Sequence, residues 1–243
     1  MRQLWFRSDQ VGWNPHSYEW FFRRTPLGAA FRAREQEAIF DLLGPILEPV
    51  HSVLEVGCGT GNYTVPVARR CKRMVAVDSS PEMLQYLRQR LSQEELWNVQ
   101  IRLGHLPEGL GVAEKFDVVL AVGVLNYVEG LEESLRVLAS ALKLGGWAVF
   151  NVPLATAEGR IYALTELLNR RRINSLSAEE TVDLTEKVGL QVHTTAPTGL
   201  SRGGITLMVR AVAPPLPACG LLSSAPETLR CTPPAPSATT NGH

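Results

Sequence analysis

The sequence lacks the features that mark metalloproteins, secreted disulfide proteins and membrane proteins. Its four cysteines are scattered without a CxxC pair or a nearby histidine cluster: Cys58, Cys71, Cys219 and Cys231. We interpret them as free thiols of a reducing compartment and predict no metal site. No segment approaches the roughly 18 consecutive apolar residues of a membrane span, and the first residues contain no apolar run of the signal-peptide type. The sequence therefore predicts a cytoplasmic protein without a membrane span.

An excess of charge of either sign is also missing. Lysine plus arginine and aspartate plus glutamate each number 24, so the formal net charge is zero. A protein that binds nucleic acid or an anionic membrane usually carries a basic excess, so neither is predicted as the main partner. With 243 residues, the chain suits one substantial α/β domain with appendages better than two domains.

Composition divides the chain into three parts. Residues 213–243 are rich in proline, serine, threonine and alanine and show no apolar period, which predicts a disordered tail. Residues 1–49 contain helical patterns with many aromatic and basic side chains, interrupted at Thr25 and Pro26. Residues 50–212 form the predicted main domain.

In the main domain, short apolar runs alternate with segments of helical period. The strand-like runs are SVLEVG, MVAVD, VQIRLG, FDVVLAVG, GWAVFNVP, LQVHTTA and GITLMVRAV. Strands and helices that alternate at this spacing predict βαβ units, and so a seven-stranded, mostly parallel sheet with helices on both faces. The last two runs have no helix between them and are predicted to form an antiparallel hairpin at one edge.

The run VLEVGCGTGNYT places three glycines directly after the first predicted strand. Glycine at Gly57, Gly59 and Gly61 allows unusual φ values and lets a ligand touch bare backbone. Asp78 ends the next predicted strand, roughly 20 residues after the glycines. This is the separation expected for a carboxylate that binds ribose hydroxyls. These features predict a ligand that contains adenosine. The spacing GxGxG, with Tyr63 where a dinucleotide fingerprint has its last glycine or alanine, departs from the NAD pattern.

Four motifs together resemble one family. VLEVGCGTGN, AVDSSPEML, FDVVLAVGVLNYV and LKLGGWAVFNVP are similar to motifs of the class I S-adenosylmethionine-dependent methyltransferases, in particular the type 11 family with the ubiquinone and menaquinone C-methyltransferases. The resemblance covers residues 50–155 well and both flanks more loosely. It implies a Rossmann-like class I methyltransferase fold, S-adenosylmethionine as methyl donor, S-adenosylhomocysteine as product and a small-molecule acceptor.

The resemblance also implies which residues bind the cofactor. Glu55 matches the position that helps to hold the ammonium group, Asp78 the ribose-binding acid, and Gly123 the loop next to the methyl group. Many members have an aspartate at the position of His105, so the contact of that residue with the adenine amino group is in question. The implied set is Glu55, Gly57, Cys58, Gly59, Gly61, Asp78, Ser79, Met83, His105, Leu106, Val122 and Gly123.

The acceptor side is less well defined. Residues 1–49 are expected to form a helical cap on the substrate side, as N-terminal helices do in similar enzymes, and residues 154–186 a variable lid. Candidates for acceptor contact are Tyr18, Trp20 and Tyr127, and the aromatic cluster of the cap also includes Trp13.

We assign no catalytic residue, because a sulfonium methyl group is already electrophilic and orientation supplies much of the catalysis. The Asn-Pro-Pro-aromatic motif of many N-methyltransferases is absent, which weakens a nitrogen acceptor.

Two other functions stay open at this point. A nicotinamide-dependent oxidoreductase shares the glycine turn and Asp78, although the sequence has no recognisable Tyr-x-x-x-Lys pair. A non-catalytic module that binds S-adenosylmethionine is compatible with the lack of an obvious catalytic residue.

Overall fold

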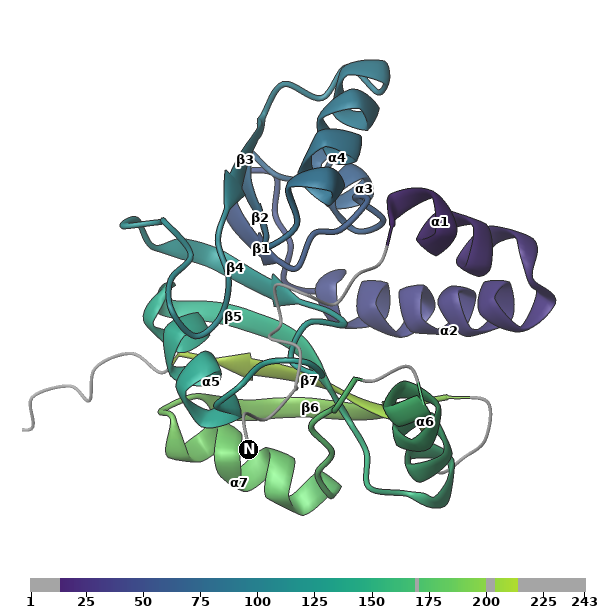
Figure 1. The fold of residues 1–243 in the computed structure, drawn as a ribbon. Helices are drawn as coiled ribbons and strands as arrows, with labels where there is room; N and C mark the ends of the chain where they lie inside the picture. Colours follow the sequence, from purple (N-terminus) through teal and green to yellow (C-terminus); the bar gives the residue numbers. More distant parts are fainter. Residues whose placement is uncertain (1–13, 169–170, 200–203, 214–243) are drawn as a thin grey trace, which may run out of the picture.

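The computed structural model describes residues 14–168, 171–199 and 204–213. The predicted tail beyond residue 213, Trp13, Cys219 and Cys231 lie outside these residues. Figure 1 shows one twisted sheet with helices packed against both faces and a pair of helices, α1 and α2, at one end of it.

The seven strands form one sheet in the order β3-β2-β1-β4-β5-β7-β6. Strands β1 to β5 pair in parallel, and β7 is antiparallel to both β5 and β6. The predicted α/β class, the mostly parallel sheet and the antiparallel edge hairpin are therefore confirmed. The strands are β1 Ser52–Val56, β2 Arg73–Asp78, β3 Val99–Leu103, β4 Phe116–Ala121, β5 Leu142–Pro153, β6 Gln191–Thr198 and β7 Thr206–Val212.

Local sequence signals explain where several helices begin. The side chains of Asn14, Thr25 and Ser80 each accept a hydrogen bond from the backbone of the first helical turn, and each is followed by a proline. Ser177 and Glu180 form a complete capping box. The helices are α1 Pro15–Arg24, α2 Pro26–Leu43, α3 Thr64–Ala68, α4 Pro81–Gln93, α5 Leu131–Ser140, α6 Ala157–Leu168 and α7 Ala178–Lys187.

One predicted helix is shorter in the structure. The pattern YTVPVARRC predicts a helix over residues 63–71, but α3 ends at Ala68. The chain has only the residues 69–72 in which to turn before β2 begins at Arg73, which leaves no room for a further helical turn.

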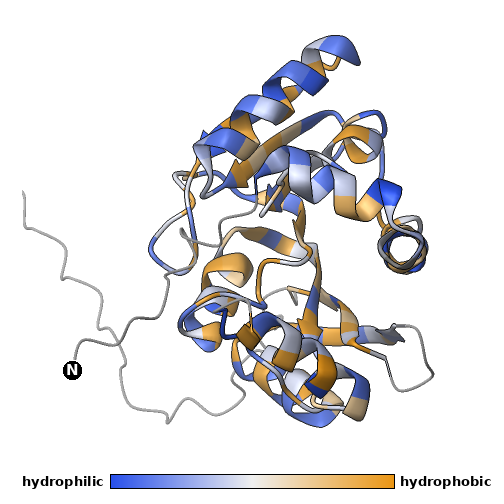
Figure 2. Cartoon of the chain, turned by 45° about the vertical axis from the view of Figure 1, so that its right-hand side comes forward, coloured by the Kyte–Doolittle hydropathy of each residue, from blue (hydrophilic) through white to orange (hydrophobic). Residues whose placement is uncertain are grey.

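Successive residues of the central strands pack on opposite faces of the sheet. Phe150 of β5 packs in a cluster with Leu138 of α5, whereas the preceding residue Val149 packs with Ile39 and Leu43 of α2. Figure 2 shows the hydrophobic residues concentrated along the strands. Because α2 covers one face of the sheet, it belongs to the core of the domain as well as to the expected cap. None of the helices in the described ranges is long and apolar enough to cross a bilayer.

Asp117, near the start of β4, ties three strands together at the edge of the sheet opposite the glycine turn. Its carboxylate accepts hydrogen bonds from the backbone and the hydroxyl of Ser52, both at 2.8 Å, and from Lys143 at 2.8 and 2.9 Å. Burial alone would raise the pKa of Asp117, but the hydrogen bonds from Lys143 and Ser52 lower it to about 2. The ionised carboxylate therefore stabilises the fold above pH 4, and this contribution is lost as the pH falls toward 2.

We expect Asp117→Asn to lower the free energy of unfolding at pH 7 by on the order of 1 to 2 kcal/mol, after allowance for the partial exposure of the ion pair. The difference between the variant and the wild type should shrink as the pH is lowered from 5 to 2, because the wild-type carboxylate becomes protonated. Urea unfolding curves at several pH values measure this difference. A difference that stays constant across this range would contradict the assigned pKa shift.

Candidate functional site

A cavity of about 680 Å³ lies at the carboxyl ends of the central strands. The turns that follow β1, β2, β3 and β4, together with Asn151 near the end of β5, line one side of it, and side chains of α1, α2 and α6 line the other. In an open parallel sheet this edge, where the strand order reverses next to β1, is the usual ligand site. The cavity therefore has one wall made by turns of the sheet and one made by helices.

Hydrogen bonds hold the glycine turn against the end of β2. The backbone amides of Gly57 and Cys58 donate to the carbonyl of Val77 at 2.8 and 3.0 Å. Asp78 accepts a hydrogen bond from the amide of Gly59 at 2.8 Å with one carboxylate oxygen, and from the amide of Ser80 at 2.9 Å with the other. Burial raises the pKa of Asp78, and the backbone donors oppose this shift. The carboxylate predicted to bind ribose thus also fixes the shape of the turn.

The glycines of the turn serve two different purposes. A side chain at Gly61 would place its Cβ 2.4 Å from Leu87 of α4, so this glycine permits close packing of the turn on the helix. Gly59 has φ +51° and nothing within 4 Å of the position of a Cβ, and it lines the cavity. Gly123, after β4, is open in the same way. These two glycines present bare backbone to a ligand, which fits a nucleoside cofactor held at the strand ends.

Glu55 lies beneath the turn and does not line the cavity. Its side chain is 2% exposed and accepts a hydrogen bond from the hydroxyl of Thr64 at 2.6 Å. Burial raises the pKa of Glu55 to about 8, although the hydrogen bond from Thr64 opposes the shift. The carboxyl group is thus protonated at neutral pH, and its expected contact with an ammonium group stays a prediction.

The other predicted positions divide between the cavity wall and its surroundings. Within the cofactor set, Gly61 lies outside the cavity lining together with Glu55. Tyr18 of α1 and Tyr127 of the loop after β4 line the cavity, whereas Trp20 does not line it and is 61% exposed. The members of the cofactor set that line the cavity are Gly57, Cys58, Gly59, Asp78, Ser79, Met83, His105, Leu106, Val122 and Gly123.

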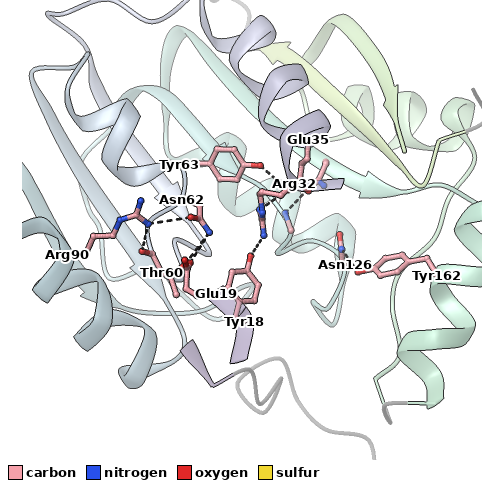
Figure 3. A network of polar contacts seen from close by, with 12 residues as sticks. Tyr18, Glu19, Arg32, Glu35, Thr60, Asn62, Tyr63, Arg90, Asn126 and Tyr162 are labelled. Atoms are coloured by element: carbon pink, nitrogen blue, oxygen red, sulfur yellow. Dashed lines mark hydrogen bonds and ion pairs between the residues drawn. The ribbon is translucent and has the colours of Figure 1, made fainter. Parts of the chain in front are cut away.

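A buried ion pair joins α1, α2 and the glycine turn (Figure 3). Arg32 and Glu35 of α2 are 2.7 Å apart, and their side chains are 12% and 6% exposed. Arg32 also donates to the hydroxyl of Tyr18 at 2.5 Å, and Tyr63 donates to Glu35 at 2.9 Å. The guanidinium lies 4.1 Å from the ring centroid of Phe22. Each charge of this pair is therefore satisfied within the protein.

A second network binds α1 to the glycine turn (Figure 3). Glu19 accepts hydrogen bonds from the hydroxyl of Thr60 and, at 3.3 Å, from the side chain of Asn62. It also pairs with Arg23 at 2.5 Å. Arg90 of α4 donates to the carbonyl of Thr60 at 3.1 Å. These contacts place the helical cap directly on the cofactor side, and no spacing in the sequence indicates which residues make them.

Buried tyrosines form the far end of the cavity. The hydroxyls of Tyr127 and Tyr162 are 3.2 Å apart, and Asn126 donates to Tyr162 at 3.3 Å. Glu166 accepts a hydrogen bond from Tyr127 at 3.4 Å and pairs with Arg171 at 3.2 Å. Burial raises the pKa of both tyrosines, so their phenols stay protonated at neutral pH. The two phenols can therefore donate hydrogen bonds but do not carry a negative charge.

The predicted lid contains two helices with different positions. α6 contributes Ile161 and Tyr162 to the cavity wall, whereas α7 packs against β6.

Within the described parts of the chain, no three histidine, cysteine, aspartate or glutamate side chains gather closely enough to hold a metal ion. Burial raises the pKa of the Cys58 thiol well above its usual value, so this cysteine is an unreactive part of the turn.

Comparison with known proteins agrees with this geometry. Residues 53–146 match a family model described as a methyltransferase domain. Trans-aconitate 2-methyltransferase of Mycobacterium sp. (strain KMS) is 33% identical over 144 residues, which cover 58% of this chain and 50% of the relative. Magnesium-protoporphyrin O-methyltransferase of Rhodobacter capsulatus is 40% identical over 76 residues, which cover 31% of this chain and 33% of the relative. The chain spans about half the length of the first of these curated relatives.

Solved structures share the fold. Magnesium protoporphyrin IX methyltransferase of Synechocystis PCC 6803, with bound S-adenosylhomocysteine, has a TM-score of 0.65 at 16% identity, over 81% of this chain and 91% of that one. The N-methyltransferase NodS of Bradyrhizobium japonicum, in complex with S-adenosylhomocysteine, has a TM-score of 0.60 at 21% identity, over 82% of this chain and 98% of that one. The predicted Rossmann-like fold is therefore confirmed.

The raised pKa of Glu55 predicts a pH-dependent effect of its replacement. In the folded state Glu55 stays protonated up to about pH 8, whereas in the unfolded state it ionises near pH 4 to 5, so its contribution to stability falls as the pH rises through this interval. We expect Glu55→Gln, which resembles the protonated form, to gain stability relative to the wild type by on the order of 2 kcal/mol between pH 5.5 and pH 8. Urea unfolding at both pH values measures the change. A difference between variant and wild type that stays constant from pH 5.5 to pH 8 would show that the carboxylate is already ionised in the fold.

The buried pair of Arg32 and Glu35 makes a second prediction. Arg32→Met should lower the free energy of unfolding by about 3 kcal/mol, because it leaves Glu35 buried without its counter-charge. The double variant Arg32→Met/Glu35→Gln should recover most of that loss, since the neutral amide still accepts the hydrogen bond from Tyr63. Denaturation of the wild type, both single variants and the double variant measures the coupling. Equal losses in Arg32→Met and the double variant would mean that Arg32 acts by packing on Phe22 alone.

Proposed function

We propose that this chain, whose residues 53–146 match a methyltransferase domain and which has the class I methyltransferase fold, transfers a methyl group from S-adenosylmethionine to a small-molecule acceptor. The predicted resemblance to the class I S-adenosylmethionine-dependent methyltransferases is confirmed by the family model and by the relatives that match. Similarity to the quinone C-methyltransferases in particular stays an expectation. A nicotinamide-dependent oxidoreductase is not favoured, because the matched family and relatives are methyltransferases.

The observation that carries the proposal is the arrangement of Asp78 and the open glycines. Asp78 lies at the carboxyl end of β2, lines the cavity and is held by backbone amides of Gly59 and Ser80. In this position we expect its carboxylate to accept hydrogen bonds from ribose hydroxyls. Gly59 and Gly123 border the same cavity with nothing within 4 Å of the place of a side chain. The site therefore suits an adenosine group that continues along bare backbone toward β4.

The helices would exclude water from the transfer. Bound S-adenosylmethionine would supply an electrophilic methyl group. As an acceptor atom bonds to the methyl carbon, the carbon–sulfur bond would break and its electron pair would stay on sulfur. The protein then needs chiefly to hold donor and acceptor in line, which contributes roughly 7 to 11 kcal/mol in favourable cases. α1 and α2, anchored by Glu19 and Arg32, cover the cavity for this purpose. Tyr127 and Tyr162 do not take the acceptor proton, because burial keeps both phenols protonated.

Binding of S-adenosylhomocysteine tests this proposal. Asp78→Ala should weaken binding at least about tenfold, because it removes charge-assisted hydrogen bonds to the ribose and the support of the Gly59 amide. Isothermal titration calorimetry of the wild type and the variant measures the change. Asp183→Asn, at an exposed position on α7, is the matched control and should bind as the wild type does. Absence of binding to the wild type, or equal affinity of Asp78→Ala, would contradict the proposed cofactor.

Turnover separates an enzyme from a module that only binds the cofactor. The proposal requires S-adenosylhomocysteine to form from S-adenosylmethionine when a suitable acceptor is present. Tight cofactor binding without turnover on quinol, phenol and carboxylate acceptors would instead support the non-catalytic alternative.

A further inference from the structure

Four side chains that line the cavity each have a buried polar atom without a hydrogen-bond partner among the described residues. They are Arg32 at Nε, Asn126 at Oδ1, Asn151 at Nδ2 and Thr206 at Oγ1. The guanidinium of Arg32 is already paired with Glu35, and the three uncharged residues Asn126, Asn151 and Thr206 are 5%, 1% and 2% exposed. Buried polar groups in native proteins nearly always have a hydrogen-bond partner, because leaving one unpaired costs the free energy of its desolvation. Each of these atoms has almost no accessible surface, so a ligand in the cavity provides its partner when the side chain turns toward the ligand.

Asn126, Asn151 and Thr206 come from different parts of the chain, and Asn151 contacts the loop of Gly123. Asn151 and Thr206 are on neighbouring strands, since Asn151 pairs with Met208 in the register of β5 and β7. The amide of Gly123 donates to Oδ1 of Asn151 at 2.7 Å, which fixes the orientation of the side-chain amide and leaves Nδ2 as the unpaired group. Gly123 belongs to the loop expected to border the methyl donor. The unpaired donor of Asn151 is therefore placed to orient an acceptor beside that loop.

Two ion pairs neutralise four of the charged side chains around this part of the cavity. Arg32 pairs with Glu35 at 2.7 Å, and Glu166 pairs with Arg171 at 3.2 Å. Glu158, which also lines the cavity, interacts with other residues of the protein. An acceptor with a carboxylate or an ammonium group would have to displace one of these partners or lose its hydration without compensation. The cavity thus disfavours charged acceptors of either sign.

The remaining surface of this half of the cavity is largely aromatic. The rings come from α1, α2, α6 and the loop after β4 and are those of Tyr18, Phe21, Phe22, Phe31, Tyr127 and Tyr162. Aromatic walls gain most from a flat apolar ligand, on which they stack face to face or edge to face.

From these observations we propose that the acceptor is an uncharged ring compound that carries a hydroxyl or carbonyl group. The ring lies between the aromatic side chains of the cap and of α6, and its polar group pairs with Asn126, Asn151 and Thr206. This inference rests on the proposed methyl transfer and adds the chemical class of the acceptor. Because trans-aconitate carries several carboxylates, the structure separates this chain from its relative of that name in the choice of acceptor.

Binding of matched ring compounds to the protein saturated with S-adenosylhomocysteine tests the class. p-Cresol, p-hydroxybenzoate and p-hydroxybenzylamine share a phenol ring and differ in charge at pH 7. We expect p-cresol, or the larger neutral phenol β-naphthol, to bind at least about tenfold more tightly than either charged compound. Isothermal titration calorimetry measures the affinities, and formation of S-adenosylhomocysteine from S-adenosylmethionine reports whether a bound phenol is also methylated.

The outcomes separate the two proposals. If S-adenosylhomocysteine binds but a charged ring binds as tightly as the neutral ones, or no neutral ring binds at millimolar concentration, the acceptor class is wrong and the proposed cofactor stands. If S-adenosylhomocysteine itself does not bind, the proposed function fails and the acceptor class fails with it.

A pair of variants tests the polar groups themselves. Thr206→Val removes an unpaired buried hydroxyl that lines the cavity, and Ser134→Ala removes one on α5 that is also buried but lies outside the cavity. Only Thr206→Val should weaken binding of the neutral phenol, by about tenfold, while both variants keep the affinity for S-adenosylhomocysteine and neither lowers the melting temperature. Unchanged phenol affinity in Thr206→Val would overturn the assigned role. A lowered melting temperature with unchanged phenol affinity would show that the hydroxyl is structural.

Discussion

The position of β1 between β2 and β4 is the constraint on which the site depends. A parallel sheet whose strand order reverses at β1 leaves the end of this strand open to a ligand, with the ends of its two neighbours on either side. The glycine turn follows β1 directly, and its amides are bonded to Val77 and Asp78 at the end of β2. The backbone that would meet the cofactor is therefore held by the hydrogen bonds of the sheet itself, so the site is formed before a ligand arrives.

The cap depends on the same turn. α1 reaches it through Glu19 and Thr60, and α2 reaches it through Glu35 and Tyr63. Buried ion pairs such as that of Arg32 and Glu35 contribute little net stability, since the desolvation of both charges offsets their attraction. What this pair contributes is geometry: the hydrogen bonds of Arg32 to Tyr18 and of Tyr63 to Glu35 hold α1 and the glycine turn against α2, and the pair adds no net charge to the cavity wall.

Methyl transfer explains why so few residues of the site look catalytic. The donor supplies the reactivity, so the protein contributes position, exclusion of water and recognition of the acceptor. In the proposed reaction the glycine turn and Asp78 would position the donor. The aromatic rings, with Asn151 and Thr206, would recognise the proposed acceptor. The wall made by turns of the sheet would therefore hold the donor, and the wall made by helices would recognise the acceptor.

The sequence by itself determined the fold class, the strand at each motif and the cofactor edge. Those features rest on local signals, namely apolar periods, helix caps and glycines that directly follow a strand, and the confirmed resemblance is confined to them. Tertiary structure alone decided the acceptor side. Glu35 and Tyr63, which share a hydrogen bond, are separated by a strand and a turn, and Asn151 meets the loop of Gly123 only through the pairing of β4 with β5. Such contacts depend on strand register and helix orientation, so no spacing along the chain indicates them. For the same reason Trp20, predicted from composition to touch the acceptor, lies outside the cavity, while the neighbouring Phe21 lines it.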